Sequence, residues 1–303
     1  MGYLPKKGVG VELVEFPSAG REVQGAIFNP DVKLYRDCTT AVVLVHGVES
    51  YWYSPPTMFL ACYLPEEGYT VLGYNGVHSG ESFRTSEFER AVNEVGDAIF
   101  FMKKRGFENI FLVGHSLGTP IVEYYQGLDP DPAVKAAGVY GPHIDIPAVT
   151  RESLLGPGPY EHFAAECRDL VARGKGDEIK VLPFREGKVI ITSAKTFVSY
   201  RDVETSKAAV EKMIRHIKVP LLIVYDPADN TQGKGSITKR ETIATRIKES
   251  ALISPRADIV VIPSNPGNSP FQAHLFLHNE RAVIRATVDW LKAIGLNPAR
   301  TRH

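Results

Sequence analysis

The chain has 303 residues, and its 35 Lys+Arg balance its 35 Asp+Glu, so the formal net charge is zero. Proteins that bind nucleic acid usually carry a basic excess or a basic stripe, so this balance argues against a nucleic-acid partner. Apolar residues make up 44% and charged residues 23%, which are the proportions of a globular protein and exclude disorder of the whole chain.

The cysteines and the N-terminal residues indicate the compartment. Cys38, Cys62 and Cys167 lie far apart and form no CxxC pair, so we expect free thiols in a reducing compartment. Residues 1–14 lack the charged and then apolar pattern of a signal peptide, and no run of 18 apolar residues occurs in the chain. We therefore expect a cytoplasmic protein with no membrane partner.

Two short alternating stretches open the chain, at residues 10–16 and 22–28, and Pro17-Ser18-Ala19-Gly20 separates them. This pattern predicts an antiparallel hairpin. Further runs are rich in β-branched residues, as a strand covered on both faces requires. They occupy residues 40–46, 69–74, 109–114, 136–140, 219–225 and 257–263.

Helical patterns lie between and after these strands. Apolar residues recur at helical spacing over residues 88–105 and 282–294, and residues 119–126 are compatible with a helix. Strands that alternate with helices predict the α/β class, with a mostly parallel sheet and helices on both of its faces.

The segment 143–215 interrupts this alternation. It contains a helical pattern at 160–173, a loop-rich stretch at Gly156-Pro157-Gly158-Pro159, and no clear core strand. An excursion of this length between two core strands is more typical of an inserted cap than of a structureless loop. The predicted organisation is a core of residues 1–142 and 216–303 with a cap at residues 143–215.

A candidate nucleophile follows the strand at 109–114. The pattern G-x-S-x-G, formed by Gly114-His115-Ser116-Leu117-Gly118, lies between that strand and a helix. In this context it is typical of a nucleophile elbow, a strained turn that lifts the serine hydroxyl above the sheet. Side chains at the two glycine positions would collide with neighbouring backbone. We therefore predict that Ser116 is a nucleophile.

A serine nucleophile requires an oxyanion site, because negative charge develops on the substrate oxygen. The strand at 40–46 ends in His46-Gly47-Val48-Glu49, beside the expected position of the elbow. We predict that the backbone amides of Val48 and Leu117 form the oxyanion hole.

The acid and the base should follow later strands. Asp226 abuts the strand at 219–225, whereas Asp229 lies further into the loop and can turn toward a histidine, so Asp229 is the preferred acid. His274 and His278 lie before the last helix. More loop separates His274 from the start of that helix, so His274 is the preferred base. The alternatives Asp226 and His278 remain open. The order Ser, Asp, His is the one expected for this architecture.

Residues near the elbow and the oxyanion turn are candidates for the substrate pocket. They are His46, Glu49, Tyr51, Trp52 and His115. Packing against the core is the competing interpretation for the aromatic pair and for His115. The nine histidines show no H-E-x-x-H spacing, so we predict no metal site. We also expect no cofactor.

These segments together resemble the α/β-hydrolase superfamily over about residues 20–295. The resemblance rests on HGVE at 46–49, GVHSGES at 76–82, GHSLG at 114–118, LLIVYDPADN at 221–230 and the late histidine. It implies the α/β-hydrolase fold, with Asp226 in place of a strand-ending glycine and Asp229 at the position of the acid. The chain departs from the pattern in its long loop before His274 and in lacking a Gly-Gly-Gly oxyanion run.

Other segments are similar to a group that includes fungal siderophore-ester hydrolases. They are EVGDAIFFMKKRGFENIFLVGHSLG, EYYQ, GPHID, ARGKGDEIKVLPF and SAKTFVSYRD. The predicted function is a serine hydrolase that cleaves a small carboxylic ester or lactone through an acyl-enzyme. An amide or peptide hydrolase with the same triad, and a small-molecule binding protein with little turnover, are the alternatives. The substrate and the oligomeric state stay open.

Overall fold

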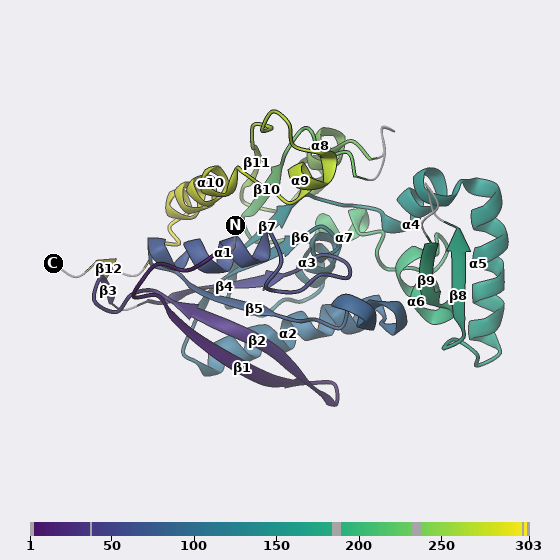
Figure 1. Ribbon diagram of the computed structural model, residues 1–303, viewed down its shortest axis with the longest axis horizontal. Coiled ribbons are helices and arrows are strands. Elements are labelled where there is room, and N and C mark those ends of the chain that lie inside the picture. Colours follow the sequence, from purple (N-terminus) through teal and green to yellow (C-terminus); the bar gives the residue numbers. More distant parts are fainter. Residues whose placement is uncertain (1–2, 37, 184–188, 232–237, 299, 302–303) are drawn as a thin grey trace.

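An eight-stranded sheet forms the centre of the computed structural model, which describes residues 3–36, 38–183, 189–231, 238–298 and 300–301. Its strand order is β1-β2-β5-β4-β6-β7-β10-β11 (Figure 1). The strands are β1 (Gly10–Ser18), β2 (Arg21–Asn29), β4 (Thr40–Val45), β5 (Thr70–Tyr74), β6 (Asn109–His115), β7 (Val134–Tyr140), β10 (Leu221–Tyr225) and β11 (Ala257–Val261).

The sheet is mostly parallel. Only β1 with β2 and β2 with β5 pair in antiparallel fashion, and the other neighbours run parallel. The predicted hairpin and the six predicted core strands are therefore confirmed, with small shifts at their ends. For example, β10 begins at Leu221 rather than at 219, because Pro220 has no N–H to donate, although its carbonyl accepts from Ala137.

Helices cover both faces of the sheet, as the alternation of elements predicts. Figure 1 shows α1 and α10 on one side of the sheet and α2 on the other. The apolar side chains of α2, α3 and α8 belong to one buried cluster and those of α1 and α10 to a second. These helices are α1 (Thr57–Tyr63), α2 (Phe88–Lys104), α3 (Gly118–Gly127), α8 (Arg240–Ser250) and α10 (Glu280–Ala293).

Most of the chain between β7 and β10 forms a group of elements to one side of the sheet (Figure 1). They are α4 (Ile146–Val149), a π-helical turn η3 (Thr150–Leu155), α5 (Pro157–Ala172), β8 (Ile179–Pro183), β9 (Val189–Ser193) and α6 (Ala194–Arg201). The last helix of the segment, α7 (Glu211–Ile214), instead packs against α3 and α8. As predicted, no strand of this segment joins the main sheet within the described residues. The antiparallel pair β8 and β9 was not predicted.

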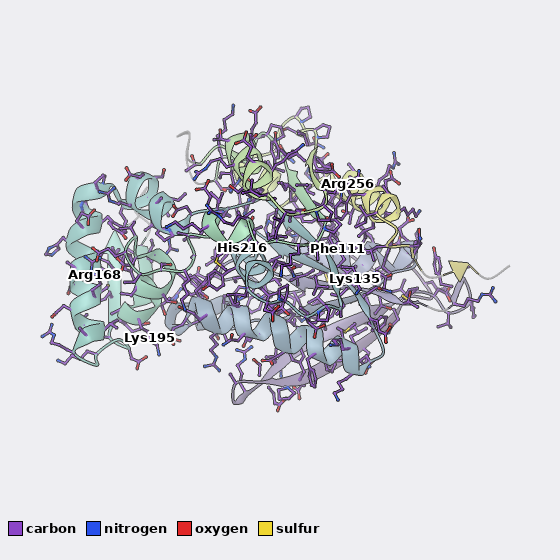
Figure 2. All side chains as sticks on the ribbon, turned by 180° about the vertical axis from the view of Figure 1, so that it is seen from behind. Phe111, Lys135, Arg168, Lys195, His216 and Arg256 are labelled. Carbon is purple, nitrogen blue, oxygen red and sulfur yellow. The ribbon has the colours of Figure 1, made fainter. Side chains whose placement is uncertain are left out.

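This segment has its own apolar core, which includes Tyr160, Phe163, Cys167 and Phe197. In Figure 2, Arg168 of α5 and Lys195 of α6 lie far from Phe111 in the sheet. The prediction of a loop at 156–159 is wrong, because α5 begins at Pro157. The amides of the first helical turn lack intrahelical partners in any case, so proline is tolerated there.

The smaller elements lie around this framework. They are β3 (Tyr35–Arg36) paired with β12 (Arg300–Thr301), α9 (Pro270–His274) and the 3-10 turns η1 (Pro65–Glu67) and η2 (Gly80–Thr85). No helix within the described residues is long and apolar enough to cross a membrane.

Phe111→Ala tests the packing of the sheet. Phe111 on β6 is fully buried, and its ring lies 5.9 Å from that of Trp290 on α10. The substitution should lower the free energy of unfolding by about 3–5 kcal/mol, because it leaves a cavity. Phe100→Ala is the matched control, since Phe100 is 57% exposed and its loss should cost less than about 0.5 kcal/mol. Equal urea midpoints for the two variants would contradict this packing.

Candidate active site

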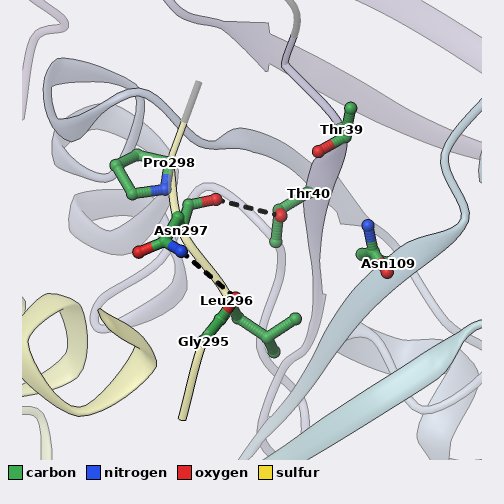
Figure 3. Close-up of a pocket in the computed structure, with 7 residues that line it drawn as sticks. All are labelled: Thr39, Thr40, Asn109, Gly295, Leu296, Asn297 and Pro298. Carbon is green, nitrogen blue, oxygen red and sulfur yellow. Dashed lines mark hydrogen bonds between the residues drawn. The ribbon is translucent and has the colours of Figure 1, made fainter. Parts of the chain in front are cut away.

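Two cavities lie at opposite ends of the parallel strands. The first, drawn in Figure 3, lies at the amino ends of β4 and β6 and is lined by Thr39, Thr40, Asn109, Gly295, Leu296, Asn297 and Pro298. The described residues of its lining include no acidic, basic or histidine side chain. Ligands of parallel α/β sheets bind outside the carboxyl ends of the strands. The second cavity, at that end, is therefore the candidate site.

The second cavity has a volume of about 500 Å³ and lies between the sheet and the 143–215 segment. The candidates Val48, Glu49, His115, Ser116, Leu117 and His274 line it from the core. His143, Ile146, Val149, Thr150, Leu154, Val189, Ile190, Ile191, Tyr200 and Arg201 line it from the other side. None of this second group was predicted from the sequence to belong to the site.

Ser116 lies at a strained turn between β6 and α3. Its φ is +53°, in the left-handed region that non-glycine residues rarely adopt, and its amide donates to the carbonyl of Tyr140 at 3.0 Å. A Cβ on Gly114 would lie 2.2 Å from the carbonyl oxygen of Gly118, and one on Gly118 would lie 2.3 Å from that of Val45. The two glycines are therefore required for this turn, as the sequence suggested.

His274 and Asp229 form a short hydrogen bond. The distance between His274 Nδ1 and Asp229 Oδ2 is 2.6 Å, and both side chains are buried. Because a carboxylate only accepts, Nδ1 carries the proton and Nε2 is free to accept another. No hydrogen bond joins Ser116 Oγ to His274 within the described ranges. In hydrolytic sites this contact often forms only when substrate is bound.

The expectation that His274 lies in a loop is wrong, because it ends the short helix α9. Ser269 accepts from the amide of Gln272, and the Gln272 side chain accepts from the amide of Ser269. This capping box, followed by Pro270 at the first helical position, fixes the start of the helix. The sequence Ser269-Pro270-Phe271-Gln272 is therefore a helix signal that the prediction of a loop left out.

The alternative acid and base lie elsewhere. His278 is exposed, and its Nδ1 lies 3.0 Å from Asn268 Oδ1. Asp226 accepts hydrogen bonds from the amide of Ala228 and the hydroxyl of Ser264. The structure thus brings His274 and Asp229 together and leaves His278 and Asp226 outside that pair.

The turn at the end of β4 approaches the elbow closely. A Cβ on Gly47 would lie 3.1 Å from the Cβ of Ser116, so the turn could not approach as closely with a larger residue. Among the described residues, the amides of Val48 and Leu117 donate no hydrogen bond to another part of the protein. Two unpaired amides beside a serine are the arrangement that can hold an oxyanion.

The turn at the end of β4 contacts a buried polar network that includes His46, His78 and Glu94. The amide of Glu49 donates to the carbonyl of His78 at 3.1 Å, and His78 Nε2 donates to the carbonyl of His46 at 3.0 Å. Glu94 Oε2 accepts from the amide of Val77 at 2.6 Å, and Glu94 Oε1 lies 3.2 Å from Arg21 Nε. Burial raises the pKa of Glu94 to about 7, although Arg21 acts in the opposite direction.

Three of the candidate pocket residues lie outside the lining that the structure describes. His46 is buried, and its Nε2 accepts from the amide of Gly76 at 3.1 Å. Tyr51 stacks on Tyr53 with ring centroids 4.9 Å apart, and Trp52 packs edge-on against Phe28. Glu49 and His115 are the two candidates of this set that reach the cavity.

Comparison with known proteins supports this architecture. Residues 40–152 match the family model for the alpha/beta hydrolase fold, a range that includes Val48 and Ser116. Est1E from Butyrivibrio proteoclasticus, solved with ferulic acid, has a TM-score of 0.67 at 16% identity, and the match covers 94% of this chain and 100% of that one. The chain has the α/β-hydrolase fold. The resemblance drawn from the sequence motifs is confirmed.

Two other proteins bear on the finer resemblance. The siderophore hydrolase EstB from Aspergillus fumigatus has a TM-score of 0.63 at 15% identity, with 96% of this chain and 99% of that chain covered. Epoxide hydrolase B of Mycobacterium tuberculosis is 33% identical over 119 residues, which are 39% of this chain and 32% of the relative. The matched region spans about a third of the length of this curated relative. The match to EstB supports the fold of the chain.

Arg240 is the main residue of this site that the sequence analysis missed. It is only 1% exposed, its Nε lies 2.6 Å from Asp229 Oδ2, and one terminal nitrogen donates to the carbonyl of Pro142. Burial alone would raise the pKa of Asp229, but His274 and Arg240 hold it well below 3.8. Asp229 is therefore a carboxylate that His274 and Arg240 share.

The histidines next to His274 are neutral at physiological pH. The ring of His115 lies 4.7 Å from that of His274, and its Nε2 donates to the carbonyl of His274 at 3.0 Å. The ring of His143 lies 6.2 Å from that of His274. Burial lowers the pKa of both neighbours well below 6.5. Neither adds a positive charge beside His274 at pH 7.

Glu94→Gln tests the buried polar network next to the turn at the end of β4. Because burial raises the pKa of Glu94 from 4.5 to about 7, the folded protein keeps a proton that the unfolded chain releases near pH 4.5. Between these two pH values the folded state binds more protons, so the wild-type free energy of unfolding should fall as pH rises, by up to about 3 kcal/mol. The free energy of unfolding of the variant minus that of the wild type should therefore rise as the pH increases through this window, because glutamine does not titrate. Parallel pH curves from urea unfolding would contradict the raised pKa.

Arg240→Met tests the shared carboxylate. Removal of the guanidinium leaves Asp229 buried with less compensation, so the free energy of unfolding should fall by about 3–5 kcal/mol. Arg240→Lys is the control, because it keeps the charge and loses only the planar fork, and it should cost less. An unfolding midpoint for the methionine variant equal to that of the wild type would show that Asp229 does not depend on this cation.

Proposed function

We propose that the protein is a serine hydrolase that cleaves a carboxylic ester or lactone through a Ser116–His274–Asp229 triad. The observation that carries the proposal is the 2.6 Å hydrogen bond between His274 Nδ1 and Asp229 Oδ2 beside a cavity that Ser116 also lines. A serine, an imidazole and a buried carboxylate in this relation are the groups that acyl transfer needs. The strained φ of Ser116 further supports a nucleophilic role.

Acylation begins with proton transfer from Ser116 Oγ to His274 Nε2 as the oxygen attacks the carbonyl carbon. Asp229 holds the Nδ1 proton in place and stabilises the imidazolium that forms. The amides of Val48 and Leu117 bind the oxyanion of the tetrahedral intermediate. Collapse of this intermediate breaks the bond to the alcohol, which leaves with the proton from His274, and the acyl group stays on Ser116.

Deacylation repeats these steps with water as the nucleophile. His274 takes a proton from the water, which attacks the acyl carbon, and the same two amides hold the second oxyanion. The proton then returns to Ser116 Oγ as the acid product leaves. In this proposal residues 1–142 and 216–303 are the catalytic core, and residues 143–215 are a cap that determines which substrates fit. The cavity residues that the cap supplies support this division.

The epoxide hydrolase relative raises a second chemistry, which the nucleophile disfavours. Attack by Ser116 on an epoxide would form an ether, and an ether has no carbonyl that water could attack. The reaction would therefore stop after one turnover. An ester or lactone instead gives an acyl-serine, which water can cleave.

Ser116→Ala and His274→Ala should each lower kcat by several orders of magnitude on para-nitrophenyl esters, because removal of one triad member removes the function of the unit. His278→Ala is the matched control, since His278 is exposed and bonded to Asn268, and it should keep wild-type activity. Circular dichroism should show all three variants folded. Loss of activity only in the His278 variant would contradict the base assignment.

Labelling with a fluorophosphonate separates catalysis from simple binding. The wild type should label at Ser116 and the alanine variant should not. A wild type that neither labels nor hydrolyses an ester, lactone or amide would instead support a small-molecule binding protein. Faster cleavage of an amide than of the matched ester would favour the amide hydrolase alternative.

A further inference from the structure

The candidate cavity carries more positive than negative charge. Its described lining contains two arginines, Arg84 and Arg201, and one carboxylate, Glu49. Arg84 is compensated, because its guanidinium lies 2.7 Å from Glu81 and 3.6 Å from Glu49. Arg201 therefore accounts for the excess charge of the cavity wall.

Arg201 forms no ion pair with an acidic side chain within the described residues. One terminal nitrogen donates to the hydroxyl of Thr150 at 3.0 Å, and no carboxylate oxygen of those residues lies within 4.0 Å of the guanidinium. The adjacent Asp202 is buried and pairs with Arg168 at 2.6 Å instead. Among the residues that the structure describes, four of the five N–H groups of the guanidinium thus have no acceptor.

The position of Arg201 is fixed by its neighbours. It ends α6, and its carbonyl accepts from the hydroxyl of Tyr160 at 2.8 Å, while the amide of Val203 donates to the same hydroxyl. Thr150, which is fully buried, in turn donates to the carbonyl of Ile146. The guanidinium is therefore partly buried in a defined place on the cap side of the cavity.

A cation in this setting is costly unless an anion compensates it. Burial lowers the pKa of Arg201 to about 10, and Glu49 acts in the opposite direction, so the side chain is charged at pH 7. Stabilisation of the end of α6 by a positive charge is the purely structural explanation. That role would leave substrate preference unchanged, and it does not require the guanidinium to face a cavity.

We propose that Arg201 binds a carboxylate carried by the substrate of Ser116. The planar guanidinium can donate two parallel hydrogen bonds to the two carboxylate oxygens, which would orient the substrate across the cavity. The inference rests on the proposed ester hydrolysis and narrows its substrate class to acidic esters.

The test compares matched pairs of esters. Mono-para-nitrophenyl esters of succinic, glutaric and adipic acid carry the carboxylate on the acyl side, and para-nitrophenyl butanoate, pentanoate and hexanoate are their neutral matches. Para-carboxyphenyl butanoate carries the carboxylate on the alcohol side, and para-carbamoylphenyl butanoate is its neutral match. For at least one pair, the wild type should show kcat/KM about 10- to 100-fold higher for the acidic ester, the usual effect of a hydrogen bond to a charged group.

Arg201→Met should lower this ratio of acidic to neutral kcat/KM toward one, and Arg201→Lys should give an intermediate ratio. Arg84→Met is the control, because Arg84 lines the same cavity but has its own carboxylates, and it should keep the wild-type ratio. If the methionine variant does not fold, the ratio of acidic to neutral kcat/KM of the wild type alone tests whether the site prefers a carboxylate.

The outcomes separate the two proposals. Hydrolysis of both members of every pair without a preference for the acidic ester would overturn the carboxylate site and leave the ester hydrolase standing. A preference that persists in Arg201→Met would also overturn it. Failure to hydrolyse any ester or to label with the fluorophosphonate would instead overturn the proposed function on which the inference rests.

Discussion

One buried carboxylate, that of Asp229, links the parts of the candidate site. Its Oδ2 lies 2.6 Å from both His274 Nδ1 and Arg240 Nε. A lone carboxylate in this place would be too costly to keep ionised, because its solvation by water is lost. The two partners keep it charged, and the short distances fix the orientation of the His274 ring. Asp229 and Arg240 also connect the loop after β10 to α8, so the same contact joins the site to the fold.

The arrangement divides recognition from chemistry. Ser116, the turn at Val48 and the Asp229–His274 pair all follow the carboxyl ends of parallel strands of the sheet, where loops converge. The opposite wall of the cavity belongs to the 143–215 segment, whose own apolar core holds Arg201 in place. In the function that we propose, the sheet supplies groups common to acyl transfer. The cap then supplies the charge and shape that select a substrate.

Similarity to known proteins establishes the fold, whereas the reaction and the substrate have to be inferred from the side chains of the site. The solved structures match nearly the whole chain at 16% identity or less in the two cases described, whereas the epoxide hydrolase relative matches only 39% of it. Fold alone does not determine reaction or substrate. The ester or lactone substrate that we propose therefore follows from the chemistry of Ser116 as nucleophile. The acidic substrate that we propose follows from Arg201.

The sequence alone was sufficient for the sheet, because buried parallel strands need continuous apolar runs that periodicity reveals. It was also sufficient to single out Ser116 and the turn at Val48, since their glycines are required by local backbone geometry. Asp229 and His274 could be named only with alternatives, because several residues of the right type lie within a few positions of each.

Tertiary structure alone decided the rest. Asp229 rather than Asp226, and His274 rather than His278, lie within hydrogen-bond distance of each other, which is a relation between a loop and the end of α9, 45 residues apart in the chain. Arg240 and Arg201 gave no signal in the sequence, because an arginine on a helix is usually solvated. Their importance arises from burial and from the presence or absence of a nearby carboxylate. Only the packing of the cap and the core determines these properties.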